Sequence, residues 1–164
     1  MTELSRIIQQ FENCFKGNPF AWHGSSLLPT IENISAEKAI QRPITEAHNI
    51  WELVRHITIW RNEAKKSLEG ESFPFLPDDQ EWPPIHDKCE EAWKDTIDKL
   101  KMTHKGFMET LSSFDPKKFD VRININEPWS SPWLETTFYE LIYGTLHHEI
   151  YHCGQIAILK KKNQ

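Results

Sequence analysis

Cysteine is scarce in this sequence, and its scarcity argues against two classes of small protein. The chain has three cysteines, Cys14, Cys89 and Cys153, an odd number at wide and irregular spacing. Disulfide-rich domains and cysteine-based zinc knuckles both need patterned pairs of cysteines. We therefore expect reduced thiols, and we expect Cys153 to be a small buried hydrophobic residue rather than a ligand.

Long apolar runs and a surplus of basic residues are also missing. There is no stretch of about 18 apolar residues that could cross a bilayer, and MTELSRIIQQFENCF at the N-terminus lacks the basic start and apolar centre of a signal peptide. We therefore expect a cytoplasmic protein that does not contact a membrane. The net charge of −5, from 19 Lys and Arg against 24 Asp and Glu, is unlike that of proteins that bind nucleic-acid phosphates.

The residues that are present indicate one folded domain built from helices. A chain of 164 residues, 38% hydrophobic and 26% charged, is long enough to bury a core. Strand candidates are few: VRININ at 121–126 could form a short strand, while the proline-rich stretch 71–86 must be a crossing loop. We predict an all-α fold, a four-helix bundle with long crossing loops, over residues 1–164. Its long helices are expected at 3–16, 46–69, 87–111 and from 134 or 135 to the end, with room for short helices between 20 and 45.

The sequence HEIYH, residues 148–152, matches the His-Glu-x-x-His pattern of zinc proteases. On a helix His148 and His152 lie roughly 40° apart, one turn along the same face, so both imidazoles can reach one metal ion. Glu149 falls near the middle of the apolar face, where a carboxylate needs a metal ion or a cation beside it. The alternative without a metal is two partly exposed histidines, with Glu149 paired to an arginine such as Arg55.

The residues around this motif do not favour a zinc protease. Such proteases take their third protein ligand from downstream, and the twelve residues that follow, CGQIAILKKKNQ, contain no His, Asp or Glu. They also present an edge strand to the substrate peptide, and few strands are expected here. A third ligand must therefore come from upstream.

Several upstream histidines are candidates for this third ligand. Position favours His56, which lies mid-helix in WELVRHITIW, on the flank of an apolar stripe as His148 and His152 do on the last helix. If these two helices are neighbours in a bundle, the three side chains could converge on one cleft. His147 is rotated roughly 100° away from the apolar face and is expected in solvent. The remaining candidates are His23, His48, His86 and His104.

Two stretches together resemble the DinB-like superfamily of metal-binding four-helix bundles: W-E-L-V-x-H-I-x-x-W around His56, and an H-x-x-x-H followed by G-Q near the C-terminus. The similarity covers 46–69 and 135–160 in sequence and the rest of the chain in layout. Carried over by position, the resemblance implies that His56, His148 and His152 bind the metal. It implies no DNA binding, in agreement with the acidic charge.

Three imidazoles leave a fourth coordination position open, as in catalytic zinc sites. Histidine ligands suit Zn²⁺ and Ni²⁺, and we expect one divalent metal ion per chain, zinc before nickel. Glu149 is a candidate general base or a partner of the ligands, and Gln155 could donate a hydrogen bond at the site.

The resembled superfamily includes metal-dependent hydrolases and transferases of low-molecular-weight thiols such as bacillithiol or mycothiol. Hydrolysis of a small-molecule substrate and thiol transfer therefore both stay open, and Arg55 and Arg61, which flank His56, could line a pocket for a thiol cosubstrate. A third alternative is a metal-stabilised binding or interaction module without turnover. The resemblance and the surplus of aromatic residues lead us to expect a homodimer. Tryptophans in the proline-rich loops, Trp82 among them, could line a pocket mouth.

Overall fold

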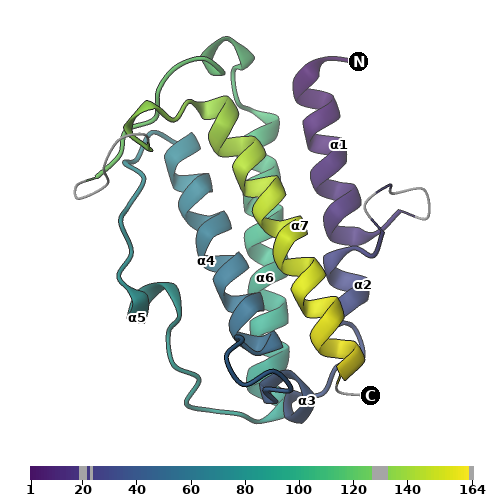
Figure 1. Cartoon of the computed structure of the whole chain (residues 1–164). Coiled ribbons are helices and arrows are strands. Elements are labelled where there is room, and N and C mark those ends of the chain that lie inside the picture. The colour runs from purple at the N-terminus through teal and green to yellow at the C-terminus, as the bar shows by residue number, and fades with distance from the viewer. Residues whose placement is uncertain (19–21, 23, 127–132, 163–164) are drawn as a thin grey trace.

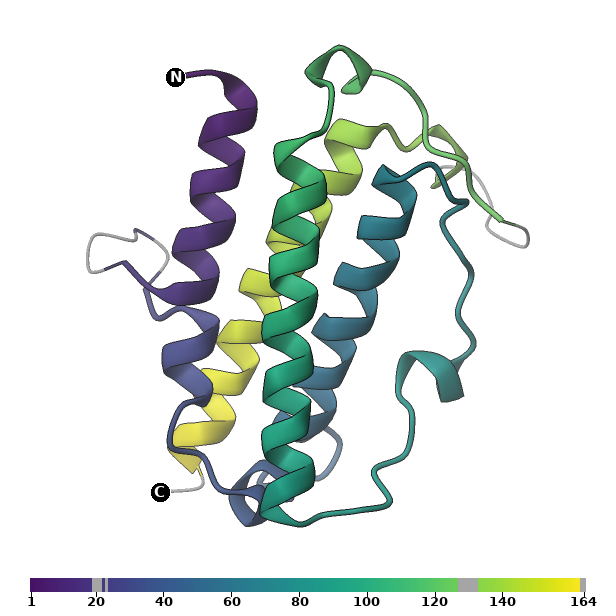
Figure 2. The ribbon, with the colours of Figure 1, turned by 180° about the vertical axis from the view of Figure 1, so that it is seen from behind.

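Four long helices form the body of the molecule (Figure 1). The computed structural model describes residues 1–18, 22, 24–126 and 133–162. Helices α1 and α7 run in one direction and α4 and α6 in the other, as the view from behind also shows (Figure 2). Helix α4 packs against α6 and α7, and α1 packs against the same two helices. The predicted all-α bundle is confirmed. The long helices are α1 (Glu3–Lys16), α4 (Ile50–Leu68), α6 (Glu90–Ser112) and α7 (Phe138–Lys162).

Two short helices, α2 (Leu27–Ile31) and α3 (Ala36–Ile40), connect α1 to α4, as the sequence allowed. Because α4 and α6 are parallel, their connection must run the length of the bundle. We call residues 69–89 the crossing segment; it contains one further short helix, α5 (Asp78–Glu81). The expected crossing loop is therefore present, with one turn of helix inside it.

Three of the expected helix starts were placed too early. Helix α4 begins at Ile50 and not at residue 46, because the Asn49 side chain accepts from the backbone of Glu52, whose carboxylate accepts from the backbone of Asn49. Helix α6 begins at Glu90 and not at 87, after an N-cap at Cys89. Helix α7 begins at Phe138 and not at 134 or 135.

A second long connection, residues 113–137, leads from α6 to α7 and contains two 3-10 turns, η1 (Pro116–Lys118) and η2 (Trp133–Glu135). The two long connections touch each other, since the Phe73 amide donates to the Asn124 carbonyl at 2.7 Å and the Asn126 amide donates to Phe73 at 2.9 Å. These two hydrogen bonds form an isolated bridge between Phe73 and Ile125, and the described residues contain no strand at 121–126. The alternating isoleucines of VRININ instead hold this connection against the bundle, where Ile123 is buried.

The core has two parts along the bundle, one around Trp51 and Trp93 and the other around Phe11 and Phe107. Burying each such ring stabilises the fold by roughly 1.5–3 kcal/mol. Cys153 is buried in the first part, as expected for a small hydrophobic residue. Within the described part of the chain, we find no helix with the length and apolar character that crossing a lipid bilayer requires.

Candidate metal centre

The facing sides of α4 and α7 bring together three histidines that are distant in sequence. His56 lies in the middle of α4, and His148 and His152 lie one turn apart on α7. His56 and His152 are buried, at 3% and 7% exposure, and His148 is half-buried. The predicted convergence of the three side chains is therefore observed.

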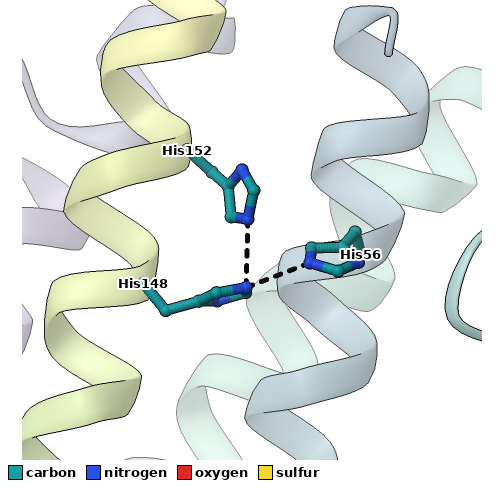
Figure 3. Close-up of side chains that lie close together, drawn as sticks. All are labelled: His56, His148 and His152. Atoms are coloured by element: carbon teal, nitrogen blue, oxygen red, sulfur yellow. Dashed lines mark hydrogen bonds between the residues drawn. The ribbon is translucent and has the colours of Figure 1, made fainter. Parts of the chain in front are cut away.

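The imidazoles point toward a common centre (Figure 3). The Nε2 atom of His148 lies 3.0 Å from Nε2 of His56 and 3.0 Å from Nε2 of His152. The three candidate ligand atoms all lie within 4.8 Å of one another. Among the described residues, no further His, Cys, Asp or Glu joins this group.

Hydrogen bonds among the three rings cannot satisfy this arrangement. A neutral imidazole nitrogen either carries a proton or presents one lone pair in the ring plane. Nε2 of His148 faces two other ring nitrogens at once, so one good hydrogen bond leaves the other contact unsatisfied. A cation that receives a lone pair from each nitrogen would remove the conflict, and neutral imidazoles are common ligands of divalent metals. The residues present therefore fit a metal ion.

Gln155 fixes the ring of His152 in the orientation that a ligand needs. Its Oε1 lies 2.6 Å from Nδ1 of His152, and its Nε2 donates to the Tyr151 hydroxyl at 3.2 Å. An amide oxygen can only accept, so Nδ1 carries the proton and Nε2 keeps its lone pair toward the other histidines. Gln155 does touch the site, but it accepts from a candidate ligand, whereas we expected it to donate.

Burial keeps the three histidines neutral. Burial, followed by the neighbouring His148 and His152, lowers the pKa of His56 to about 3. Burial followed by the neighbouring His152 lowers the pKa of His148 to about 4, and burial also lowers the pKa of His152. A metal ion competes with protons for the same lone pairs, so neutral rings at pH 7 are ready to bind one.

The crossing segment covers His56 with an aromatic stack that the sequence only partly indicated. Trp82 lies face to face with His56, with centroids 3.8 Å apart, and with His48 on its other face at 3.5 Å. Next to it, Glu81 Oε1 lies 3.8 Å from Nδ1 of His56 and accepts from Trp60 Nε1 at 3.0 Å. Trp82 was expected at a pocket mouth, while Glu81 was missed. The only signal for Glu81 is its place beside a tryptophan in the proline-rich stretch.

Glu149 lies inside the helix interface, at 1% exposure, and pairs with Arg61. The suggested pairing of Glu149 with Arg55 is wrong, because the Arg55 guanidinium donates to the Pro84 carbonyl at 3.0 Å. Arg61, at 1% exposure, is likewise not available to hold a cosubstrate. The structure thus places Glu149 outside the histidine group, beside a separate cavity of about 270 Å³ that it shares with Cys14.

The other candidate histidines that the structure describes do not reach the group. His147 and His86 are exposed, as expected for His147. His104 is buried against Phe15 on α1, with ring centroids 3.7 Å apart. His48 lies before α4, where it stacks on Trp82 and its Nδ1 lies 3.3 Å from Oε2 of Glu52, and His23 lies outside the described residues.

Two cavities flank the histidine group. One, of about 350 Å³, is lined by His148, Glu81 and several apolar side chains. The other, of about 500 Å³, is lined by His152, Gln155 and Trp82. The histidine group therefore lies next to two spaces large enough to hold a small molecule.

The fold and the site define a class of protein: an all-α bundle that can bind a metal ion through three imidazoles on neighbouring helices. Comparison with models of protein families matches residues 20–156 to the DinB superfamily, and the chain belongs to that family. Searches of curated proteins and of solved structures found no match.

Proposed function

We propose that the protein is a metal-dependent hydrolase of a small-molecule substrate, with one divalent metal ion held by His56, His148 and His152. The observation that carries the proposal is the convergence of three neutral imidazoles beside two cavities, with no fourth protein ligand among the described residues. This donor set suits zinc first and nickel second. An open fourth position is the arrangement of catalytic zinc sites.

A divalent metal ion bound there would act as a Lewis acid toward a water molecule or a substrate carbonyl group. The protein supplies orientation: Gln155 fixes the His152 ring, and Trp82 covers His56. Glu81 lines the cavity beside His148 and lies 3.8 Å from Nδ1 of His56, and we assign it the role of general base. We assign Glu149 a supporting role, since its pairing with Arg61 fixes α7 against α4.

The charges around the site favour hydrolysis over transfer of an anionic thiol. A thiol cosubstrate that carries negative charge needs cationic groups to hold it. Arg55 is bound to the crossing segment and Arg61 to Glu149. Among the described residues that line the two flanking cavities, none is lysine or arginine.

Elemental analysis of purified protein tests the metal site. We expect about one divalent ion per chain, and we expect His56→Ala and His148→Ala to lose most of it, because each removes one of three ligands. His147→Ala is the matched control, since His147 is exposed on the same helix and should leave the metal in place. Full occupancy in both alanine variants would refute the ligand assignment.

Assays on metal-loaded protein then test the chemistry. We expect cleavage within a panel of small esters and amides, and we expect Glu81→Gln to reduce it by roughly a hundredfold while the metal content is unchanged. If a low-molecular-weight thiol is instead consumed with an electrophile, thiol transfer replaces hydrolysis. Absence of both reactions in metal-loaded protein would favour a non-catalytic binding module.

A further inference from the structure

The cavity beside His148 is lined mainly by apolar side chains from different parts of the chain. The α4 and α7 helices contribute Trp60 and Leu141, and the two long connections contribute Phe73, Ile123 and Ile125. The bridge between Phe73 and Ile125 holds these two connections together beside the cavity. A site of about 350 Å³ with such walls suits the apolar body of a small molecule.

Gly144 leaves this space open immediately next to His148. It lies four residues before His148, one turn along the same face of α7, and it lines the same cavity. A Cβ atom placed on Gly144 would meet no heavy atom within 4 Å, so close packing does not require a glycine there. Glycine inside a helix costs about 1 kcal/mol relative to alanine. Glycine at this position keeps open a space beside His148 that a larger side chain would occupy.

Of the described residues that line the cavity, Glu81 and Glu140 are charged, and both are acidic. Glu81 lies beside the histidine group, and Glu140 lies one turn before Gly144 on α7. Hydrogen bonds from the Thr137 backbone amide and hydroxyl lower the pKa of Glu140, so this carboxylate stays charged at neutral pH. In the metal-free protein this cavity therefore repels anions and attracts cations. A divalent ion held by the three histidines would offset the two carboxylates.

We infer that this cavity binds the substrate of the proposed hydrolase, and that the substrate is a small molecule with an aromatic or short alkyl body. Its apolar body lies against Trp60, Phe73 and Leu141, and its reacting group points toward His148. Gly144 sets the space that the body can occupy. That the ligand is a substrate rests on the proposed function. Binding of a ligand in the cavity can be tested separately.

The test uses three probes that share a benzene ring and differ in charge: benzyltrimethylammonium, benzyl alcohol and benzenesulfonate. Binding to the full-length protein is followed by NMR titration, once saturated with zinc and once treated with a chelator. In the chelator-treated protein we expect the cation to bind roughly tenfold more tightly than the anion, with the alcohol between them, and we expect zinc to reduce this difference. Equal or tighter binding of benzenesulfonate to the chelator-treated protein would overturn the assignment of charge to the cavity.

Two substitutions on the same helix locate the probe. Gly144→Leu fills the cavity and should weaken binding of the cation by roughly tenfold or more, because the side chain and the ring cannot occupy the same space. Gly154→Leu is the matched control: Gly154 also lies in α7 with open space around it, but it lines the separate cavity of Glu149. Both changes replace glycine by a strong helix former, so both variants should fold.

Equal effects of the two substitutions, or none from Gly144→Leu, would overturn the cavity assignment. The chelator-treated sample separates this outcome from a failure of the proposed function. If the protein binds no metal but the probes still bind and respond to Gly144→Leu, the binding site stands and the hydrolase does not. If metal binds and the probes do not, the inference about the substrate is wrong.

Discussion

Acid sensitivity of the fold should depend on His104, a buried histidine that the metal centre does not use. His104 is 2% exposed, stacks on Phe15, and lies 3.8 Å from the Glu12 carboxylate and near Arg61 of α4. Burial first, and then the charges of Arg61 and Lys16, lowers its pKa from 6.5 to about 3. The folded protein therefore keeps His104 neutral at a pH where the unfolded chain has already bound a proton.

The direction and size of the effect follow from this difference. Above pH 6.5 neither state carries the proton, so the full stability is present; it falls as the pH drops from 6.5 toward 3 and changes no further below that. Between pH 7 and pH 5 the loss from this one group is about 2 kcal/mol. Replacing His104 by leucine should remove that part of the pH dependence.

Urea unfolding of the chelator-treated protein, followed by circular dichroism at pH 7 and pH 5, measures this difference. The free energy of unfolding of His104→Leu relative to wild type should shift by about 2 kcal/mol in favour of the variant on going from pH 7 to pH 5. The metal-site histidines titrate in both proteins, so their contribution cancels. Parallel pH dependences in the two proteins would show that His104 titrates normally and would refute the reasoning.

Three further predictions concern the helix interface, the aromatic stack and the assembly. Arg61→Met should lower the free energy of unfolding by about 3–5 kcal/mol, because it leaves Glu149 buried without a cation, and adding Glu149→Leu should restore most of the loss in urea unfolding. Trp82→Ala should reduce zinc affinity roughly tenfold in a competition titration with a chromophoric chelator, because it uncovers His56; unchanged affinity would contradict this. Light scattering should return twice the 19.4 kDa of one chain if the expected homodimer forms, and a constant mass of one chain over a wide concentration range would refute it.

Helical periodicity predicted the elements that carry the candidate ligands. The spacing of apolar residues placed α1 at its observed bounds and put His56, His148 and His152 on the right helices. The start of α4 was placed four residues early, although Asn49 and Glu52 form a capping box that the sequence alone displays. Periodicity finds where a helix exists better than where it begins, since the caps are set by local hydrogen bonds.

Contacts that depend on how two helices face each other could not be predicted in the same way. The sequence indicated that Glu149 needs a cation, but the choice between Arg55 and Arg61 depends on the rotation of α4 against α7. Glu81 and Trp82 lie in a proline-rich segment without periodicity, so nothing in the sequence placed them on His56. Irregular connections are positioned by the packing of the whole fold, which a local pattern does not contain.

The histidines and part of the cavity wall lie on different kinds of element, and this has a consequence for how the protein can evolve. The three histidines stand on the two helices α4 and α7, whereas Phe73, Ile123 and Ile125 of the adjoining cavity stand on the long connections. Surface connections accept substitutions and changes of length more readily than packed helices do. New ligand preferences can therefore be selected, or engineered by exchanging Phe73, Ile123 and Ile125, while the bundle, its histidines, Glu81 and Trp82 are left unchanged.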